Sequence, residues 1–221
     1  MDETSKTRKM WGEFETSILT GHGLDIGCGP DPVSPTAKRF DIEDGDANDI
    51  LHYIDDQYDY VYSSHCLEHM NDPKKALQNW WTLVKPGGYL FLIVPDEDLY
   101  EQGIFPSRFN GDHKVTFTIA KEKSWSPVSI NVLDLVLSLP QSKLVKIVLQ
   151  DYKYDRNLQN KGIIKPDKMT RLIIKWYRLL IKMTSIKIQA LEIVSSHFIA
   201  VDQTLFPDVL SQIQCIIKKN N

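Results

Sequence analysis

Apolar residues follow two different periods along this chain. Runs that are continuously apolar, or that alternate between apolar and polar, predict strands at residues 58–63, 89–94 and 144–149. Between the first two, the signal Asn71-Asp72-Pro73 predicts a helix start, because a capping side chain precedes a first-turn proline. The apolar residues of this helix recur at helical spacing and are expected in the core: Ala76, Leu77, Trp80, Trp81 and Val84.

The same reasoning predicts the elements nearer the two ends. Residues 1–10 are polar, and we expect them to be frayed, with a short helix beginning near Trp11. Ser126-Pro127 is typical of the cap and first turn of a helix, here over residues 128–139. A further strand is predicted at residues 211–218.

A glycine-rich loop follows the first short strand. Leu24 and Ile26 belong to that strand, which leads into Asp25-x-Gly27-x-Gly29. The glycines let the backbone turn sharply and approach a ligand that a Cβ would exclude. In an open α/β sheet, ligands bind in the crevice beyond the carboxyl ends of the strands. A carboxylate there could hold a cationic amino group, whereas a dinucleotide fingerprint would need a third glycine where the chain has Pro32.

Three later stretches follow this loop in a recognisable order. Acidic residues lie at 40–48, residues 58–69 read as a fourth strand followed by a helix start, and residues 83–90 as a turn into a fifth strand. Together with the loop they resemble the motifs of class I S-adenosylmethionine-dependent methyltransferases, over residues 23 to about 95. The resemblance implies an α/β, doubly wound, Rossmann-like sheet of seven strands with the last one antiparallel. It also implies S-adenosylmethionine as the cofactor.

The resemblance assigns the cofactor contacts residue by residue. The glycine loop is expected beside the amino-acid end of the cofactor, Asp41 at the ribose hydroxyls, and Asp46 at the adenine amino group. Three prolines within residues 30–35 forbid a regular helix there. Asp41 therefore follows the glycine loop after fewer residues than is usual in the family, and Glu43 or Asp44 could take its place. The cofactor-binding residues implied are Asp25, Gly27, Cys28, Gly29, Asp41, Ile42, Asp46, Ala47, Ser63 and His65.

Methyl transfer to a hydroxyl group also needs a base, and histidine is suited to that role by its pKa. The loop at residues 100–118 is rich in polar groups and lies beyond the fifth predicted strand. Within it His113 stands next to Asp112, which could orient the ring, so His113 is the predicted catalytic base. His65 is the second candidate. A structural role for either histidine is the alternative.

His65, Glu68 and His69 form the pattern H-x-x-E-H at a predicted helix start. Residues at these spacings share a helix face, so the three side chains could bind a metal. Some related methyltransferases place metal-binding residues here, but Leu67-Glu68-His69 is also common in metal-free relatives. An inverted-zincin protease would leave the glycine loop unexplained. We therefore expect no functional metal.

Composition narrows the class of protein. A chain of 221 residues fits one domain, residues 1–221, and a net charge of −3 gives no case for nucleic-acid binding. Three scattered cysteines indicate reduced thiols in a cytoplasm rather than a disulfide framework. The charged N-terminus shows no secretory signal, and no apolar run reaches membrane-spanning length.

Residues 156–195 are predicted to form a helical insertion before the last strand. Within it, residues 168–182 carry a basic stripe beside an apolar one (Lys168, Arg171, Lys175, Arg178 and Lys182). A solvated helix face is the simpler interpretation. The alternative is a basic amphipathic helix that lies on a membrane surface or mediates self-association.

The predicted function is therefore S-adenosylmethionine-dependent O-methylation of a sugar, a nucleotide sugar or a surface glycan. The loops after the fifth strand resemble those of methyltransferases from bacterial surface-polysaccharide loci. Three alternatives stay open: another small-molecule methyltransferase, a cofactor-binding module without catalysis, and a nucleotide-binding dehydrogenase, which the missing third glycine disfavours.

Overall fold

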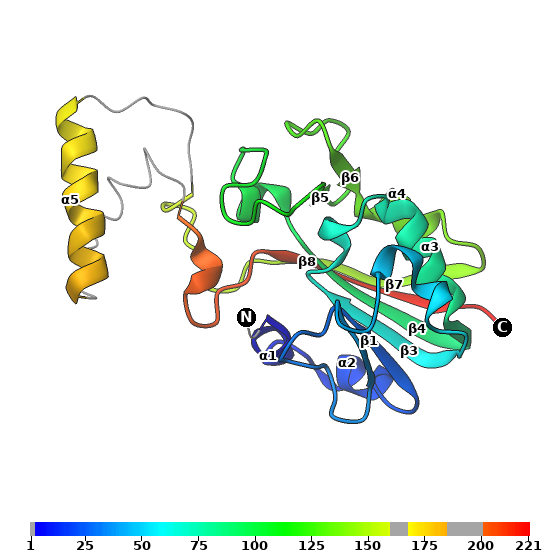
Figure 1. Cartoon of the computed structure of the whole chain (residues 1–221). Helices are drawn as coiled ribbons and strands as arrows, with labels where there is room; N and C mark the ends of the chain where they lie inside the picture. The colour runs from blue at the N-terminus through cyan, green and yellow to red at the C-terminus, as the bar shows by residue number, and fades with distance from the viewer. Residues whose placement is uncertain (1–2, 160–167, 185–200) are drawn as a thin grey trace.

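The computed structural model describes residues 3–159, 168–184 and 201–221 (Figure 1). Its elements in chain order are α1 (Glu3–Arg8), α2 (Glu13–Ile18), β1 (Gly23–Ile26), β2 (Lys38–Phe40), η1 (Ala47–His52), β3 (Tyr58–Ser64), η2 (Leu67–His69), α3 (Pro73–Thr82), β4 (Val84–Pro95), η3 (Glu97–Glu101), β5 (Thr116–Thr118), β6 (Ser129–Asn131), α4 (Val132–Leu137), β7 (Ser142–Gln150), α5 (Lys168–Thr184), η4 (Gln203–Leu205) and β8 (Gln212–Lys219). The fold is mixed α/β, as predicted.

The central sheet has the strand order β2-β1-β3-β4-β8-β7. The first four strands are parallel, and β8 runs antiparallel between β4 and β7. The strands predicted at 58–63, 89–94, 144–149 and 211–218 are confirmed. The expected seventh strand is not found, because the described residues contribute six strands to this sheet. Between β2 and β3 the chain instead forms the short helix η1, which the Asp46 side chain caps.

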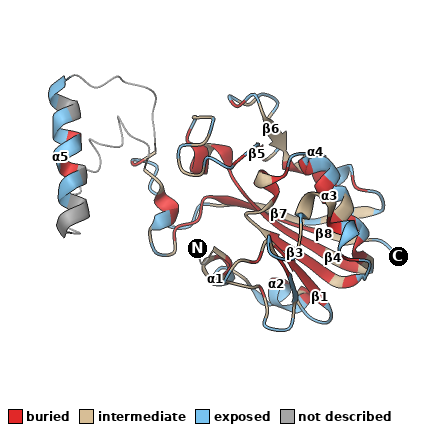
Figure 2. Cartoon of the chain, in the orientation of Figure 1, coloured by how far each residue is buried: buried red, intermediate tan, exposed pale blue. Residues whose placement is uncertain are grey.

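The middle of the sheet is buried on both faces, which explains the apolar runs in the sequence (Figure 2). On one face Tyr60 and Tyr62 pack in a cluster with Ile18 of α2. On the other face the larger core cluster includes Trp80 of α3 and Leu135 of α4. The core positions predicted for this helix are all buried, although Val84 belongs to β4 and not to α3.

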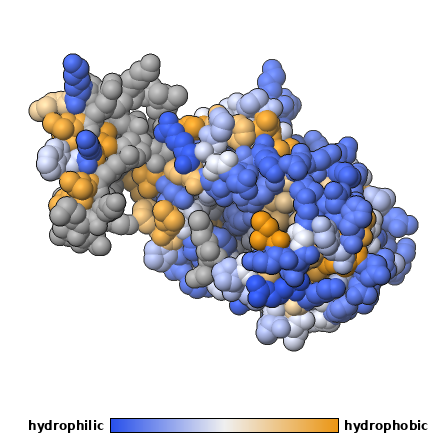
Figure 3. Space-filling view, viewed as in Figure 1, coloured by the Kyte–Doolittle hydropathy of each residue, from blue (hydrophilic) through white to orange (hydrophobic). Residues whose placement is uncertain are grey.

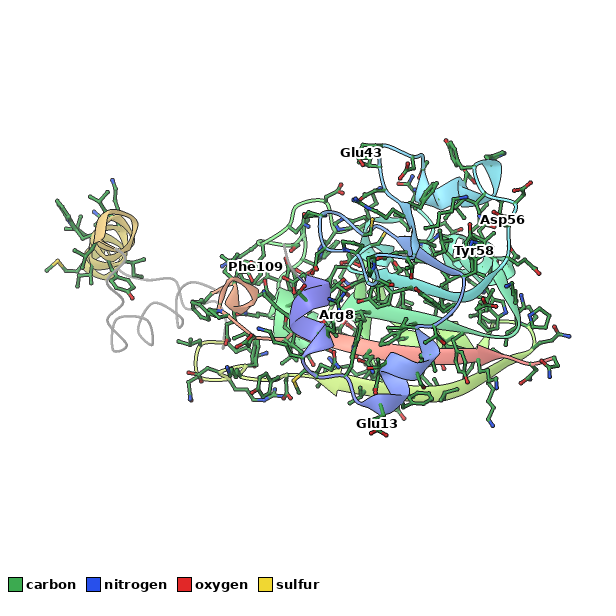
Figure 4. All side chains as sticks on the ribbon, turned by 90° about the horizontal axis from the view of Figure 1, so that it is seen from below. Arg8, Glu13, Glu43, Asp56, Tyr58 and Phe109 are labelled. Carbon is green, nitrogen blue, oxygen red and sulfur yellow. The ribbon has the colours of Figure 1, made fainter. Side chains whose placement is uncertain are left out.

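The N-terminal segment is ordered, so the expectation of a frayed end is wrong for residues 3–10. Its polar residues have partners inside the fold. Ser5 donates through its backbone N–H and its hydroxyl to the Asp31 carboxylate, at 2.7 and 2.6 Å. Thr7 is fully buried and accepts a hydrogen bond from Gln212 Nε2 at 2.8 Å. In Figure 4, seen from below, α1 lies in front of the sheet with Arg8 on it.

Of two further predictions about helices, one is confirmed and the other is wrong about where the helix begins. No helix separates β1 from β2, as the prolines at 30–35 predicted. The helix expected over residues 128–139 begins only at Val132, because residues 129–131 form β6. Its cap is Asn131 rather than Ser126, since the Asn131 side chain accepts hydrogen bonds from the N–H groups of Leu133 and Asp134.

The basic segment predicted at residues 168–182 is helical and forms α5. The rest of the insertion predicted at 156–195 lies largely outside the described residues. In Figure 1 this helix stands apart from the sheet. Several of its apolar side chains are exposed (Figure 3): Met169, Leu172, Ile173, Trp176, Leu179 and Leu180. No helix in the described ranges combines the length and the apolar character needed to cross a membrane.

Candidate active site

Two adjoining cavities lie at the carboxyl ends of the parallel strands. The first, which we call the polar cavity, has a volume of about 240 Å³ and is lined among others by Glu3, Gly29, Glu68 and His113. The second, which we call the larger cavity, has a volume of about 750 Å³. Both cavities share Gly27, His65 and His69 in their walls, so they lie side by side.

The glycine loop contributes to the walls of these cavities. Gly27 has a φ of 72°, and a Cβ there would lie 2.7 Å from the side chain of Cys66, so only glycine fits. Gly29 also has a left-handed φ of 52°, and no atom lies within 4 Å of the position that its Cβ would take. Its N–H donates to Asp41 Oδ2 at 2.6 Å. The loop therefore offers open space beside a backbone that Asp41 holds in place.

Two of the predicted cofactor residues lie behind the cavity walls instead of in them. Asp25 is buried, and its Oδ2 accepts a hydrogen bond from the Val33 N–H at 2.6 Å. Burial raises the pKa of Asp25 to about 7. Ser63 is fully buried and donates its hydroxyl to the Ile26 carbonyl, whereas its neighbour Ser64 lines the polar cavity. Direct cofactor contacts predicted for Asp25 and Ser63 find no support in these positions.

The larger cavity gathers the acidic residues that follow β2. Asp41 and Asp46 line it together with Ala47 and Ile42. Ile42 is 86 % exposed, which is unusual for an isoleucine and leaves an apolar surface on the cavity rim. Asp46 caps η1, and hydrogen bonds from Asn48 lower its pKa, so it is a carboxylate at neutral pH. The wall thus combines apolar surface with carboxylates.

His113 is buried in the polar cavity beside a carboxylate that the sequence did not indicate. Its Nδ1 lies 2.6 Å from Glu101 Oε1, and its ring stacks on Tyr100 with 5.1 Å between the centroids. The expected pairing of His113 with Asp112 is wrong. Asp112 points outward, and its carboxylate lies 3.1 Å from His69 Nδ1 instead.

His65 lies at the end of β3 between the two cavities. It has a φ of 52°, and its Nε2 lies 2.9 Å from Gln212 Oε1 of β8. Its Nδ1 is 3.5 Å from Glu68 Oε1. Burial disfavours the imidazolium, but the Glu68 carboxylate outweighs this effect and raises the pKa of His65 to about 9. A protonated ring cannot accept a proton, so this environment disfavours His65 as a base.

The comparison with protein families agrees with this arrangement. Residues 6–122 match the family described as a methyltransferase domain, which is more than half of the chain. This chain belongs to the methyltransferase family. It is therefore an enzyme of the methyltransferase class, and S-adenosylmethionine is the methyl donor that its family and its loop motif imply.

Solved structures of low sequence identity are similar to this methyltransferase. One is a SAM-dependent methyltransferase from Archaeoglobus fulgidus, with 16 % identity, a TM-score of 0.49, and coverage of 99 % of this chain and 95 % of that one. Another comes from a complex between the Haloferax volcanii Trm112 methyltransferase activator and a methyltransferase. It has 13 % identity, a TM-score of 0.50, and coverage of 100 % and 92 %. A comparison with curated proteins finds no match.

The residues that line the cavities of the methyltransferase fit the chemistry of this cofactor. The open face of Gly29 leaves room for a ligand against the loop backbone. The larger cavity offers the exposed Ile42 for an aromatic ring and the Asp41 and Asp46 carboxylates for hydroxyl and amino groups. All predicted cofactor residues except Asp25 and Ser63 line one cavity or the other.

Several residues of the methyltransferase site were not predicted. Glu101 pairs with His113 across twelve positions, and no local pattern in the sequence shows that pairing. Glu3 and Thr4 of α1 line the polar cavity, although the polar N-terminus had indicated a frayed end. The H-x-x-E-H pattern did draw attention to Glu68, which lines the polar cavity and is fully buried.

Proposed function

We propose that this enzyme transfers the methyl group of S-adenosylmethionine to a hydroxyl oxygen of a small polar acceptor. The acceptor class we favour is a sugar, a nucleotide sugar or the terminal residue of a surface glycan. The observation that carries this proposal is the polar cavity beside the glycine loop. Its walls carry carboxylate, imidazole, hydroxyl and amide groups, among them Glu3, Asn110, His113 and Thr204. Such groups match the hydroxyls of a polar acceptor better than an apolar ring.

In this proposal the cofactor occupies the larger cavity and the glycine loop. Ile42 and Asp46 would hold its adenine, and Asp41 would hold its ribose hydroxyls. The amino-acid end follows Gly27 to Gly29 toward the polar cavity. When bound, the cofactor would supply an electrophilic methyl group at the walls that the two cavities share. The polar cavity beside the glycine loop would then be left for the acceptor.

The acceptor oxygen must lose a proton when it takes the methyl group. The bound cofactor would supply the methyl group, and S-adenosylhomocysteine would leave with the electron pair of the broken carbon–sulfur bond. We propose that His113 accepts the proton. The hydrogen bond from its Nδ1 to Glu101 fixes the tautomer and leaves Nε2 as the acceptor atom.

Cofactor binding is tested by calorimetry with S-adenosylmethionine. Asp46→Ala should weaken binding by about tenfold or more, because it removes a charged partner of the adenine amino group. Asp56→Ala is the matched control, since Asp56 is exposed and lines neither cavity. Equal affinities of the two variants would contradict the adenine assignment.

Acceptor chemistry is tested by screening sugars and nucleotide sugars for release of S-adenosylhomocysteine. On an active acceptor, His113→Asn should lower turnover by about 100- to 10,000-fold while cofactor affinity stays the same. The exposed His52 provides the control variant His52→Asn. Turnover only on acceptors without a hydroxyl group would contradict the proposed reaction, and near-normal turnover of His113→Asn would contradict the role of His113.

A further inference from the structure

Three potential metal ligands meet in the wall of the polar cavity. Glu68, His69 and His113 each place one ligand atom within 4.8 Å of the other two. Glu68 and His69 belong to η2, whereas His113 comes from the loop before β5. The sequence pattern had suggested His65 as the third member of this group. The fold replaces it with His113, because His65 turns its Nε2 toward Gln212.

Glu68 is a buried carboxylate without a hydrogen-bond donor. Its side chain is fully buried, and neither oxygen accepts a hydrogen bond from any described residue. The nearest charged groups are His65 Nδ1 at 3.5 Å and His113 Nε2 at 3.9 Å, both measured to Oε1. His65 at 3.5 Å compensates part of this buried charge, and a cation in direct contact with the carboxylate would compensate it more fully.

Both imidazole rings of the cluster are oriented by oxygen atoms on their far side. His113 Nδ1 lies 2.6 Å from Glu101 Oε1, and His69 Nδ1 lies 3.1 Å from Asp112 Oδ2. Metal-binding histidines are commonly held in this way, because a hydrogen bond to one nitrogen orients the other toward the metal. The arrangement leaves Nε2 of each ring as the atom that can bind a ligand.

We propose that Glu68, His69 and His113 bind one divalent first-row transition-metal cation. Two imidazole nitrogens and one carboxylate oxygen are ligands that zinc and cobalt accept, and they leave positions open toward the polar cavity. This proposal departs from the expectation, drawn from the sequence, of no functional metal. Binding itself does not depend on the proposed reaction. When the cation is bound, His113 Nε2 is a ligand, so its role as a free base belongs to the metal-free enzyme.

The proposal is tested by titrating Co²⁺ and Zn²⁺ separately into the full-length protein after chelator treatment. Calorimetry should give one equivalent of each metal, and Co²⁺ should show visible absorption bands of a low-coordinate site without charge-transfer bands from cysteine. Glu68→Gln and His113→Ala should each weaken binding by tenfold or more. His52→Ala, at an exposed histidine outside the cluster, should bind as the wild type does.

A folding defect is separated from ligand loss by a second variant. His69 is partly exposed, so His69→Ala should keep the thermal transition of the wild type and still weaken metal binding at least tenfold. Absence of binding in the wild type, or unchanged binding in both Glu68→Gln and His69→Ala, would overturn the proposal. Release of S-adenosylhomocysteine by a protein that binds no metal would leave the proposed methyl transfer intact. Metal binding without turnover on any acceptor would reject the reaction and keep the metal site.

Discussion

Buried carboxylates surround the cavities, and each is stabilised differently. Glu97 accepts hydrogen bonds from Ser124, Ser129 and Thr116 and pairs with Lys121, so its charge is fully compensated. Glu101 has His113 as its partner. A buried carboxylate loses its hydration, and the cost in free energy is larger when fewer hydrogen bonds and opposite charges replace it. The residues with the fewest partners are therefore those whose ionisation affects stability most.

Asp25 illustrates this at a single position. Its pKa is raised from 3.8 to about 7 in the folded protein, mainly by burial. The protonated form is thus favoured on folding, so Asp25 contributes stability that is fully present below about pH 4 and is lost as the pH rises through about 7. Asp25→Asn keeps an acceptor for the Val33 N–H and does not ionise.

We expect denaturant unfolding at several pH values to separate the two proteins. Between pH 5 and pH 8 the wild type should lose about 1–3 kcal/mol of unfolding free energy relative to Asp25→Asn. The measurement is made without cofactor, so that ligand binding adds nothing to the unfolding free energy. Parallel profiles of wild type and variant would show that Asp25 is already ionised at low pH.

For single residues, the sequence predicts where the backbone needs glycine better than it predicts which groups a side chain will hydrogen-bond. Gly27 was identifiable because a left-handed residue in a loop after a strand needs glycine. The orientation of the Asp25 side chain could not be predicted from the sequence. Its hydrogen-bond donor, the Val33 N–H, comes from a proline-rich loop that has no periodic pattern. The pairing of Glu101 with His113 depends on how two loops pack, and neither loop carries a pattern for it.

At the scale of elements, α1 contributes to the site through its contact with the glycine loop. Ser5 donates two hydrogen bonds to Asp31, and both Asp31 and Glu3 line the polar cavity. The N-terminal helix thus closes one side of the polar cavity by holding the loop that follows β1. A six-residue helix has little stability of its own, so these contacts hold it in place.

We expect Ser5→Ala to weaken S-adenosylmethionine binding by about two- to tenfold, since one hydroxyl hydrogen bond is worth about 0.5–1.5 kcal/mol. Calorimetry measures the affinity. Ser17→Ala is the control, because Ser17 is exposed on α2 and donates only to the Phe14 carbonyl. Equal affinities of wild type and Ser5→Ala would mean that α1 does not position the loop for the cofactor.

Helices and strands with a regular spacing of apolar residues were predicted from the sequence, whereas elements held mainly by tertiary contacts were not. The strands β3 and β4 are apolar because both faces are buried, and α3 has a capping residue and a regular apolar stripe. By contrast, α1 is polar and is held by long-range hydrogen bonds. The start of α4 shifted because the Asn131 cap prevailed over the earlier Ser126-Pro127 signal.

At the scale of the whole molecule, α5 differs in charge from the rest of the chain. The chain carries a net charge of −3, yet this helix of 17 residues has five basic residues and no acidic one. Its exposed apolar side chains include Trp176, which is 64 % exposed, and Leu172, which is 50 % exposed. We propose that α5 lies on an anionic membrane surface, as basic amphipathic helices with exposed aromatic residues do.

We expect the protein to sediment with vesicles that contain phosphatidylglycerol and to be released by high salt. Trp176→Ala should weaken the binding, because it removes the largest exposed apolar side chain of α5. Trp125→Ala is the matched control, since Trp125 is also exposed but lies outside α5. Equal vesicle binding by both variants, or a concentration-dependent dimer without vesicle binding, would contradict a membrane role.

The position of β8 has a consequence for truncated forms of the protein. This strand comes last among the described elements, yet it pairs with β4 and β7 and supplies Gln212 to His65 and Thr7. A nonsense mutation after α5 would therefore leave the edge of β4 unpaired and His65 without its amide partner. Genetic screens should find such late stop codons as damaging as early ones, with no partially active alleles among them.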